Sequence, residues 1–174
     1  MKNITLTIIV LIIIFFSYSS YKKKDFNQKK IGTSCENIFA TNVYSEAQII
    51  ENNINNYLIT TKDIYGKSSE GGEQVNYTLK NGEMILIKQI FFGEIGKSEI
   101  SYYFKNNLMF YVKKEDTEYL LPISEDSSYK IKSFEVKDFF LNSNKELCSW
   151  YKNKEMQSNS LDAKDLLEYL VSGI

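Results

Sequence analysis

The stretch QVNYTLKNGEMILIKQIFFGEIGKSEISYYFK, residues 74–105, decides the fold. Apolar and polar side chains alternate through residues 75–79 and again through 98–105, which is the period of two of a β-strand with one solvated face. Asn81-Gly82 is a strong signal for a tight hairpin turn. The run 84–92 is apolar at nearly every position, which is typical of a central strand. The stretch therefore predicts consecutive antiparallel strands.

The pattern continues along the chain to residue 151. Asn106-Asn107 can adopt the positive φ of a tight turn, so a strand over 108–113 should return beside the preceding one. A short strand over 119–123 contains Pro122, which marks an edge or an end because proline cannot donate a ladder hydrogen bond. Residues 129–141 and 146–151 form a last hairpin. We expect a mostly antiparallel β-meander of five to seven strands.

Two helices should flank the strands. Ser45 and Gln48 form a capping box, which predicts a helix over 46–58 with its isoleucine side packed on the sheet. Ser160 can cap a final helix over 161–171. The predicted fold class is α+β: an N-terminal helix on one face of the meander and a short C-terminal helix. A small β-barrel is the alternative architecture.

Five strings of residues in this region carry a family resemblance: 69–73, Tyr77, 81–83, 92–99 and 102–106. They resemble strings in uncharacterised exported bacterial proteins that have an N-terminal helix on an antiparallel meander. The resemblance covers residues 45–151. It implies the same architecture and a location in the cell envelope, and it brings no catalytic residues.

The N-terminus has the features of an export signal. Lys2 is followed by the apolar run 4–16 and by small residues up to Ser20, which predicts a signal peptide over 1–19. An uncleaved membrane anchor is the alternative, because Lys22, Lys23 and Lys24 follow at once. A lysine-rich tether over 20–34 and a single domain over 35–174 complete the expected organisation. The protein should be exported, either periplasmic or extracellular, and membrane contact is expected only through an uncleaved N-terminal segment.

The two cysteines fit the same compartment. Cys35 stands near the start of the expected domain and Cys148 near its end. In an exported protein an isolated pair usually forms one disulfide. The spacing is not Cys-x-x-Cys and no histidine is present to lower a thiol pKa, so the bond should be structural.

Missing residue types exclude many functions. The chain has no histidine, and all 21 basic residues are lysine. Ser/His and Cys/His catalytic pairs and the usual zinc sites are therefore impossible, so we expect no metal and no cofactor. A net charge of −1 gives no reason to expect nucleic acid. The protein is not expected to be an enzyme; a carboxylate-based hydrolase, using two of Glu70, Glu73, Glu83, Glu94 and Glu99, is the least favoured alternative.

Aromatic residues are the positive signal, at 14% of the chain. If the helix covers one face of the sheet, Tyr103 and Tyr111 could lie on the open face and bind an extracytoplasmic protein partner. Otherwise they are cross-strand pairs that stabilise the sheet. Trp150 is expected in the core beside the disulfide. The leading hypothesis is a non-enzymatic binding module of the cell envelope, and the second is a carrier of a small apolar ligand in a curved sheet or barrel.

Overall fold

A computed structural model describes residues 35, 40–66, 68–122, 124, 130–158, 160–172 and 174. These residues belong to one compact unit, residues 31–174. The predicted signal peptide or anchor over 1–19 and the predicted tether over 20–34 lie outside the described residues. Within the described part of the chain, neither helix has both the length and the hydrophobicity that a membrane span needs.

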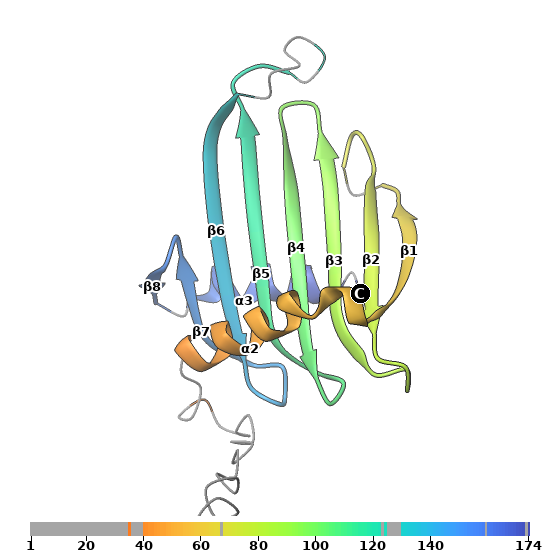
Figure 1. Cartoon of the computed structure of the whole chain (residues 1–174). Helices are drawn as coiled ribbons and strands as arrows, with labels where there is room; N and C mark the ends of the chain where they lie inside the picture. The colour runs from red at the N-terminus through yellow and green to blue at the C-terminus, as the bar shows by residue number, and fades with distance from the viewer. Residues whose placement is uncertain are drawn as a thin grey trace, which may run out of the picture. The chain divides into compact units, whose positions relative to one another are not determined.

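The unit is built on one eight-stranded antiparallel sheet in which the strands follow one another in chain order (Figure 1). The sheet is open, with the first and last strands as its two edges. The antiparallel meander is confirmed; the small-barrel alternative is wrong, and the count exceeds the predicted five to seven strands. The strands are β1 Leu58–Ile64, β2 Gly72–Thr78, β3 Met84–Gly93, β4 Gly96–Lys105, β5 Leu108–Tyr119, β6 Ile131–Leu141, β7 Leu147–Lys152 and β8 Glu155–Gln157.

The extra strands are the two edges, β1 and β8. Six of the seven residues of β1 are exposed, so it lacks the alternation that identifies a half-buried strand. β8 has three residues, too few to show a period. In the centre, β5 continues to Tyr119, where a separate short strand was predicted to begin. The prediction was wrong there because charged residues 113–116 look like a break, although they pair along both neighbouring strands.

Neighbouring residues on the central strands point to opposite faces of the sheet, and each face has its own core. Leu86, Tyr103, Tyr111 and Phe140 pair across β3 to β6 and belong to one buried cluster. The residues next to them in the chain form the other cluster, with Tyr102 and Phe139 among its members. One helix covers each face: α2 Ala40–Asn52 packs on the first cluster and α3 Leu161–Val171 on the second. In Figure 1, α2 crosses in front of the lower part of the strands and α3 lies behind them.

The helix α2 begins six residues earlier than predicted. Its buried residues are Val43, Ala47 and Ile50, which recur with helical spacing, so burying Val43 favours an added N-terminal turn. Ser45 therefore lies inside the helix and not at its cap. The helix ends at Asn52, and a 3-10 turn, η2 Ile54–Asn56, leads into β1. Residues 54–58 were predicted to be helical, and asparagine is a poor helix former, which explains the early end.

The C-terminal helix α3 matches its prediction. The Ser160 hydroxyl accepts a hydrogen bond from the Ala163 amide at 3.2 Å, which is an N-cap. Leu167 and Leu170 are buried against the sheet. The Tyr102 hydroxyl donates to the Leu170 carbonyl oxygen at 2.9 Å, fixing the end of the helix to β4.

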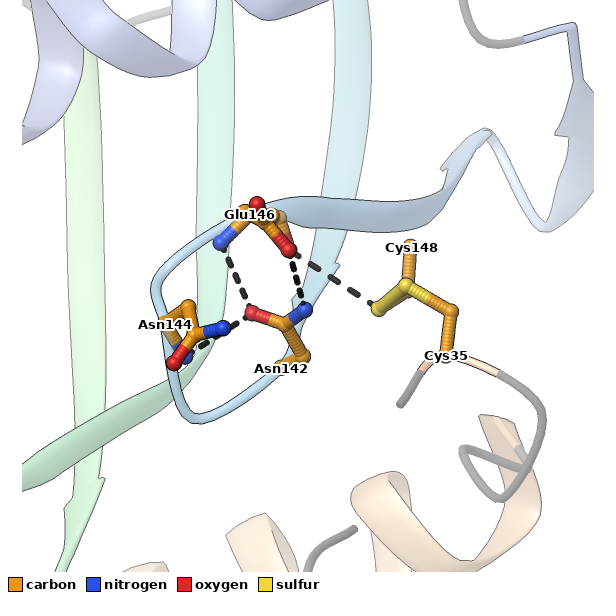
Figure 2. Close-up of a disulfide and its surroundings, with 5 residues drawn as sticks. All are labelled: Cys35, Asn142, Asn144, Glu146 and Cys148. Atoms are coloured by element: carbon orange, nitrogen blue, oxygen red, sulfur yellow. Dashed lines mark hydrogen bonds between the residues drawn. A yellow bond between two sulfur atoms is a disulfide. The ribbon is translucent and has the colours of Figure 1, made fainter. Parts of the chain in front are cut away.

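The predicted disulfide is present between Cys35 and Cys148 of β7, with the Cα atoms 5.0 Å apart (Figure 2). The two cysteines are 113 residues apart, and in the chain-entropy view closing so long a loop stabilises the fold by up to about 5 kcal/mol. The adjoining turn is held by Asn142, whose side-chain oxygen accepts from the Asn144 and Glu146 amides at 2.9 and 3.0 Å. A disulfide of this kind is typical of exported proteins.

Candidate functional site

A groove of about 890 Å³ runs beside α2 on the face of the sheet that this helix covers. One wall is α2, the floor is formed by β4 to β7, and the turn between β7 and β8 forms part of the rim. α2 crosses the lower part of the strands (Figure 1), and its residues Tyr44, Ala47, Gln48 and Glu51 line the groove. Its lining residues are Tyr44, Ala47, Gln48, Glu51, Tyr103, Tyr111, Lys113, Phe134, Val136, Asp138, Tyr151, Asn153 and Lys154.

Stacked aromatic rings form the floor of the groove. The Tyr103 and Tyr111 rings stack with centroids 4.9 Å apart, and Tyr111 stacks in turn on Phe140 at 5.3 Å. Tyr44 of α2 meets Tyr111 edge-on at 5.9 Å. Pairs of this kind stabilise a core beyond the area they bury, so the floor should be rigid.

Tyr103 and Tyr111 form a cross-strand pair, which was one of the two predicted alternatives, and the other alternative, an exposed face, is wrong. Their side chains are 4% and 2% exposed, and they lie under α2, not on a face opposite the helix. Alternation correctly placed the two tyrosines on one face, but the sequence does not say which face the helix covers. Both residues contribute to the groove only through the parts of their rings that line it.

A buried carboxylate lies at the floor of the groove. Asp138 of β6 is 3% exposed, and each of its oxygens accepts a hydrogen bond from a tyrosine. The Tyr111 hydroxyl donates to Oδ1 at 2.5 Å and the Tyr44 hydroxyl to Oδ2 at 2.9 Å. Within the part of the chain that the structure describes, no lysine lies within ion-pair distance of this carboxylate. Among the described residues, two tyrosine hydroxyls are therefore the side-chain donors to this carboxylate.

The two tyrosines keep their protons in this setting. Burial, and next the negative charge of Asp138, raise the pKa of Tyr111 well above its usual value. The same two causes raise the pKa of Tyr44. Both hydroxyls therefore remain donors over any physiological pH, and neither is a candidate general base.

The second carboxylate in the groove, Glu51 of α2, has a different environment. It accepts from Lys88 Nζ at 2.9 Å and from the Tyr103 hydroxyl at 2.8 Å. Lys113, which also lines the groove, pairs with Glu115 at 2.8 Å. These charges are compensated within the protein, unlike that of Asp138.

The groove leads into a smaller and more polar depression of about 350 Å³, which shares Glu51, Tyr103 and Lys113 with it. Glu73 and Glu99 line this depression, so two of the five glutamates considered for hydrolase chemistry share a surface. Glu99 pairs with Lys97 at 2.5 Å. Glu70, Glu83 and Glu94 line neither space.

Trp150 of β7 lies on the opposite face of the sheet from the groove. It is half-buried, stacks on Phe139 at 5.9 Å and donates from Nε1 to the Ser158 carbonyl oxygen at 2.7 Å. It therefore packs against the core under α3, and its predicted place in the core is confirmed to that extent. Among the described residues, no group of carboxylate and cysteine side chains is arranged to hold a metal ion.

Sequence reasoning missed Asp138 and Tyr44, the two residues that define the polar end of the groove. A signal for Asp138 was present in the sequence. A carboxylate directly before the apolar run 139–141 lies on a central strand, where either face of the sheet packs on a core.

Comparison of the chain with protein-family models, with curated proteins and with solved structures found no match.

Proposed function

We propose that this protein is an exported, non-enzymatic binding protein of the cell envelope whose binding site is the groove beside α2. The observation that carries the proposal is an aromatic groove of about 890 Å³ with a buried carboxylate at its floor. Ligand sites in proteins are concave, mostly apolar spaces of about 300–1,000 Å³ with a few convergent polar groups. The groove beside α2 has that size and that composition.

A small amphipathic molecule fits the groove better than an extended protein surface does. Aromatic side chains on the strands are covered by α2 over the lower part of the sheet, so they offer a hollow and not a flat face. This favours the ligand-carrier hypothesis in a modified form, with a groove on an open sheet in place of a barrel interior.

Blocking the groove tests this proposal. Gln48 is exposed on α2 and lines the groove, so Gln48→Trp should fill the space without disturbing the core. Ile49→Trp, at an exposed position on the same helix that does not line the groove, is the matched control. We expect amphipathic fragments that raise the melting temperature of the wild type to raise that of Ile49→Trp equally and to leave Gln48→Trp unchanged. Fragments that stabilise all three proteins equally would contradict the proposal.

Export is tested by the intact mass of the protein recovered from cells under non-reducing conditions. We expect a mass lacking residues 1–19 and no alkylation of Cys35 or Cys148 without prior reduction. A full-length chain with two alkylated thiols would contradict a cleaved, periplasmic or extracellular protein.

The edge strand β1 supports a second candidate function, the binding of an extracytoplasmic protein partner. Leu58 and Ile59 are 52% and 57% exposed, and β1 pairs with β2 on one side only among the described strands. An exposed edge of this kind can accept a strand from another chain.

A charge at this edge tests the second candidate function. Ile59→Lys on β1 should abolish partner binding, whereas Met156→Lys on β8, the other edge, should preserve it. Partner binding that survives Ile59→Lys would exclude this edge.

A further inference from the structure

The charges of the groove indicate which class of small molecule it accepts. The groove and the adjoining depression are lined by five carboxylates and three lysines. Three of these carboxylates, Glu51, Glu99 and Glu115, each have a lysine partner. Among the described residues, Asp138 and Glu73 have none. The surface therefore has an excess of negative charge, and the most buried part of that excess is Asp138.

A buried carboxylate without a cation is costly. Removing an ionised carboxylate from water is unfavourable unless an opposite charge or sufficient hydrogen bonds replace the lost hydration. Asp138 is 3% exposed and receives one hydrogen bond on each oxygen, although each oxygen can accept about two. Each oxygen of Asp138 therefore has acceptor capacity left over, and the residue is part of the groove lining.

From this we infer that the ligand of the groove is an organic ammonium ion whose charged nitrogen binds the Asp138 carboxylate while its apolar part lies along the aromatic floor. The inference rests on the proposed function and adds the ligand class to it. An ammonium group supplies donors and the missing positive charge, and charge-assisted hydrogen bonds are about twice as strong as neutral ones. Five aromatic side chains in the lining add to the attraction, since aromatic rings attract cations over their faces.

The rim of the groove carries a positive charge. Lys154 lines the groove from the turn between β7 and β8. Because like charges repel, Lys154→Gln should bind an ammonium ion slightly more tightly than the wild type does. Weaker binding by this variant would contradict the inference.

Three matched probes separate the inference from the proposed function: 4-phenylbutylammonium, 4-phenylbutan-1-ol and 4-phenylbutanoate. We expect the wild type to bind the ammonium ion about tenfold more tightly than the alcohol, and the alcohol more tightly than the carboxylate, as measured by NMR titration. If none of the three binds, the proposed function is wrong. If the alcohol or the carboxylate binds as tightly as the ammonium ion, the groove is a binding site and only the ligand class is wrong.

The nearly isosteric variant Asp138→Asn assigns the effect to one residue. We expect it to reduce the preference for the ammonium ion to about twofold while leaving the affinity for the alcohol unchanged. Glu155→Gln removes a negative charge from an exposed position on β8 that lines neither the groove nor the depression, and it should retain the preference. A preference lost in Glu155→Gln and kept in Asp138→Asn would overturn the assignment.

A measurement on the wild type keeps the inference testable even if Asp138→Asn does not fold. The methylene beside the nitrogen of 4-phenylbutylammonium should give nuclear Overhauser effects to the ring protons of Tyr44 and Tyr111, whose hydroxyls contact Asp138. Contacts from that methylene to Phe134 alone, at an exposed position of the lining, would overturn it.

Discussion

Carboxylates on the two faces of β6 have different partners. On the face covered by α3, Glu135 accepts from Lys137 and Lys152 at 2.5 Å each. Asp116 on the same face is paired with Lys114 and accepts from the Ser98 hydroxyl at 2.7 Å. On the face covered by α2, Asp138 is deeper than either, and its side-chain partners among the described residues are two tyrosine hydroxyls.

Glu135 and Asp116 thus have lysine partners within the protein, whereas Asp138 has none among the described residues. The ladder of lysines and acids under the α3 face is closed within the protein, and such partly exposed pairs contribute little beyond solubility and register. Asp138 stands next to Lys137 in the chain, yet strand alternation sends that lysine to the other face. The α2 face thus has a buried carboxylate whose charge the proposed ammonium ligand would neutralise.

The largest effect tests whether the two faces are equally essential to folding. Phe139 and Phe140 are adjacent, fully buried and directed to opposite faces. We expect Phe139→Ala and Phe140→Ala each to lower the free energy of unfolding by about 3–5 kcal/mol, measured by urea denaturation. A loss below about 1 kcal/mol for Phe140→Ala would show that the α2 face is not packed as described.

The tyrosines make stability sensitive to high pH. The pKa values of Tyr103 and Tyr111 on one face and Tyr102 on the other are raised, chiefly by burial. Above about pH 10 the unfolded chain releases phenolic protons that the folded chain keeps, so the free energy of unfolding falls by about 1.4 kcal/mol per pH unit for each such tyrosine. Below that pH the contribution is fully present.

Denaturation at a series of pH values checks this prediction. Tyr111→Phe and Tyr102→Phe should each reduce the slope of the free energy of unfolding against pH, above about pH 10, by about 1.4 kcal/mol per pH unit. An unchanged decline in Tyr111→Phe would mean that this hydroxyl is not buried against Asp138.

Local signals were sufficient for the centre of the sheet and for α3. Asn106 and Asn107 adopt φ values of 52° and 59°, as their turn required, and the Ser160 cap begins α3 where predicted. The start of α2 depended instead on tertiary packing of Val43, and β1 is an edge strand without a hydrophobic face of its own.

The candidate site was less accessible to sequence reasoning than the fold. It requires knowing that α2 and Tyr111 share a face, so that Tyr44 and Tyr111 meet at Asp138, 94 and 27 residues away in the chain. Periodicity places a side chain on one of two faces but does not say which helix covers that face. For this reason the sequence left two readings of Tyr103 and Tyr111 open, an exposed face or cross-strand pairs that stabilise the sheet.

A smaller effect is expected from the closed charges under the α3 face. Hydrogen bonds from Lys137 and Lys152 lower the pKa of Glu135, so its contribution to stability is present above about pH 4 and is lost as the pH falls through the lowered value. Glu135→Gln should cost about 0.2–1 kcal/mol at neutral pH and low salt, and less in high salt. Glu155→Gln on β8 is the control for loss of one negative charge, and an equal cost in both variants would show that the ladder contributes nothing.

The smallest effect comes from the rim of the groove. Lys154 has a φ of 71°, in the left-handed region that favours glycine, and Lys145 has a φ of 65° in another turn. Lys154→Gly and Lys145→Gly should each stabilise the fold by up to about 1 kcal/mol, measured by thermal denaturation. Only Lys154→Gly should alter ammonium binding, because Lys145 does not line the groove. Equal changes in binding would imply a long-range effect of net charge.

The most direct measurement is a crystal structure of the wild-type protein with 4-phenylbutylammonium. We expect the nitrogen to lie about 2.7–2.9 Å from an Asp138 carboxylate oxygen, with the phenyl ring along the groove beside α2. A nitrogen bound instead to Glu135 or Asp116 on the α3 face, or a groove left without the probe at saturating concentration, would contradict the account.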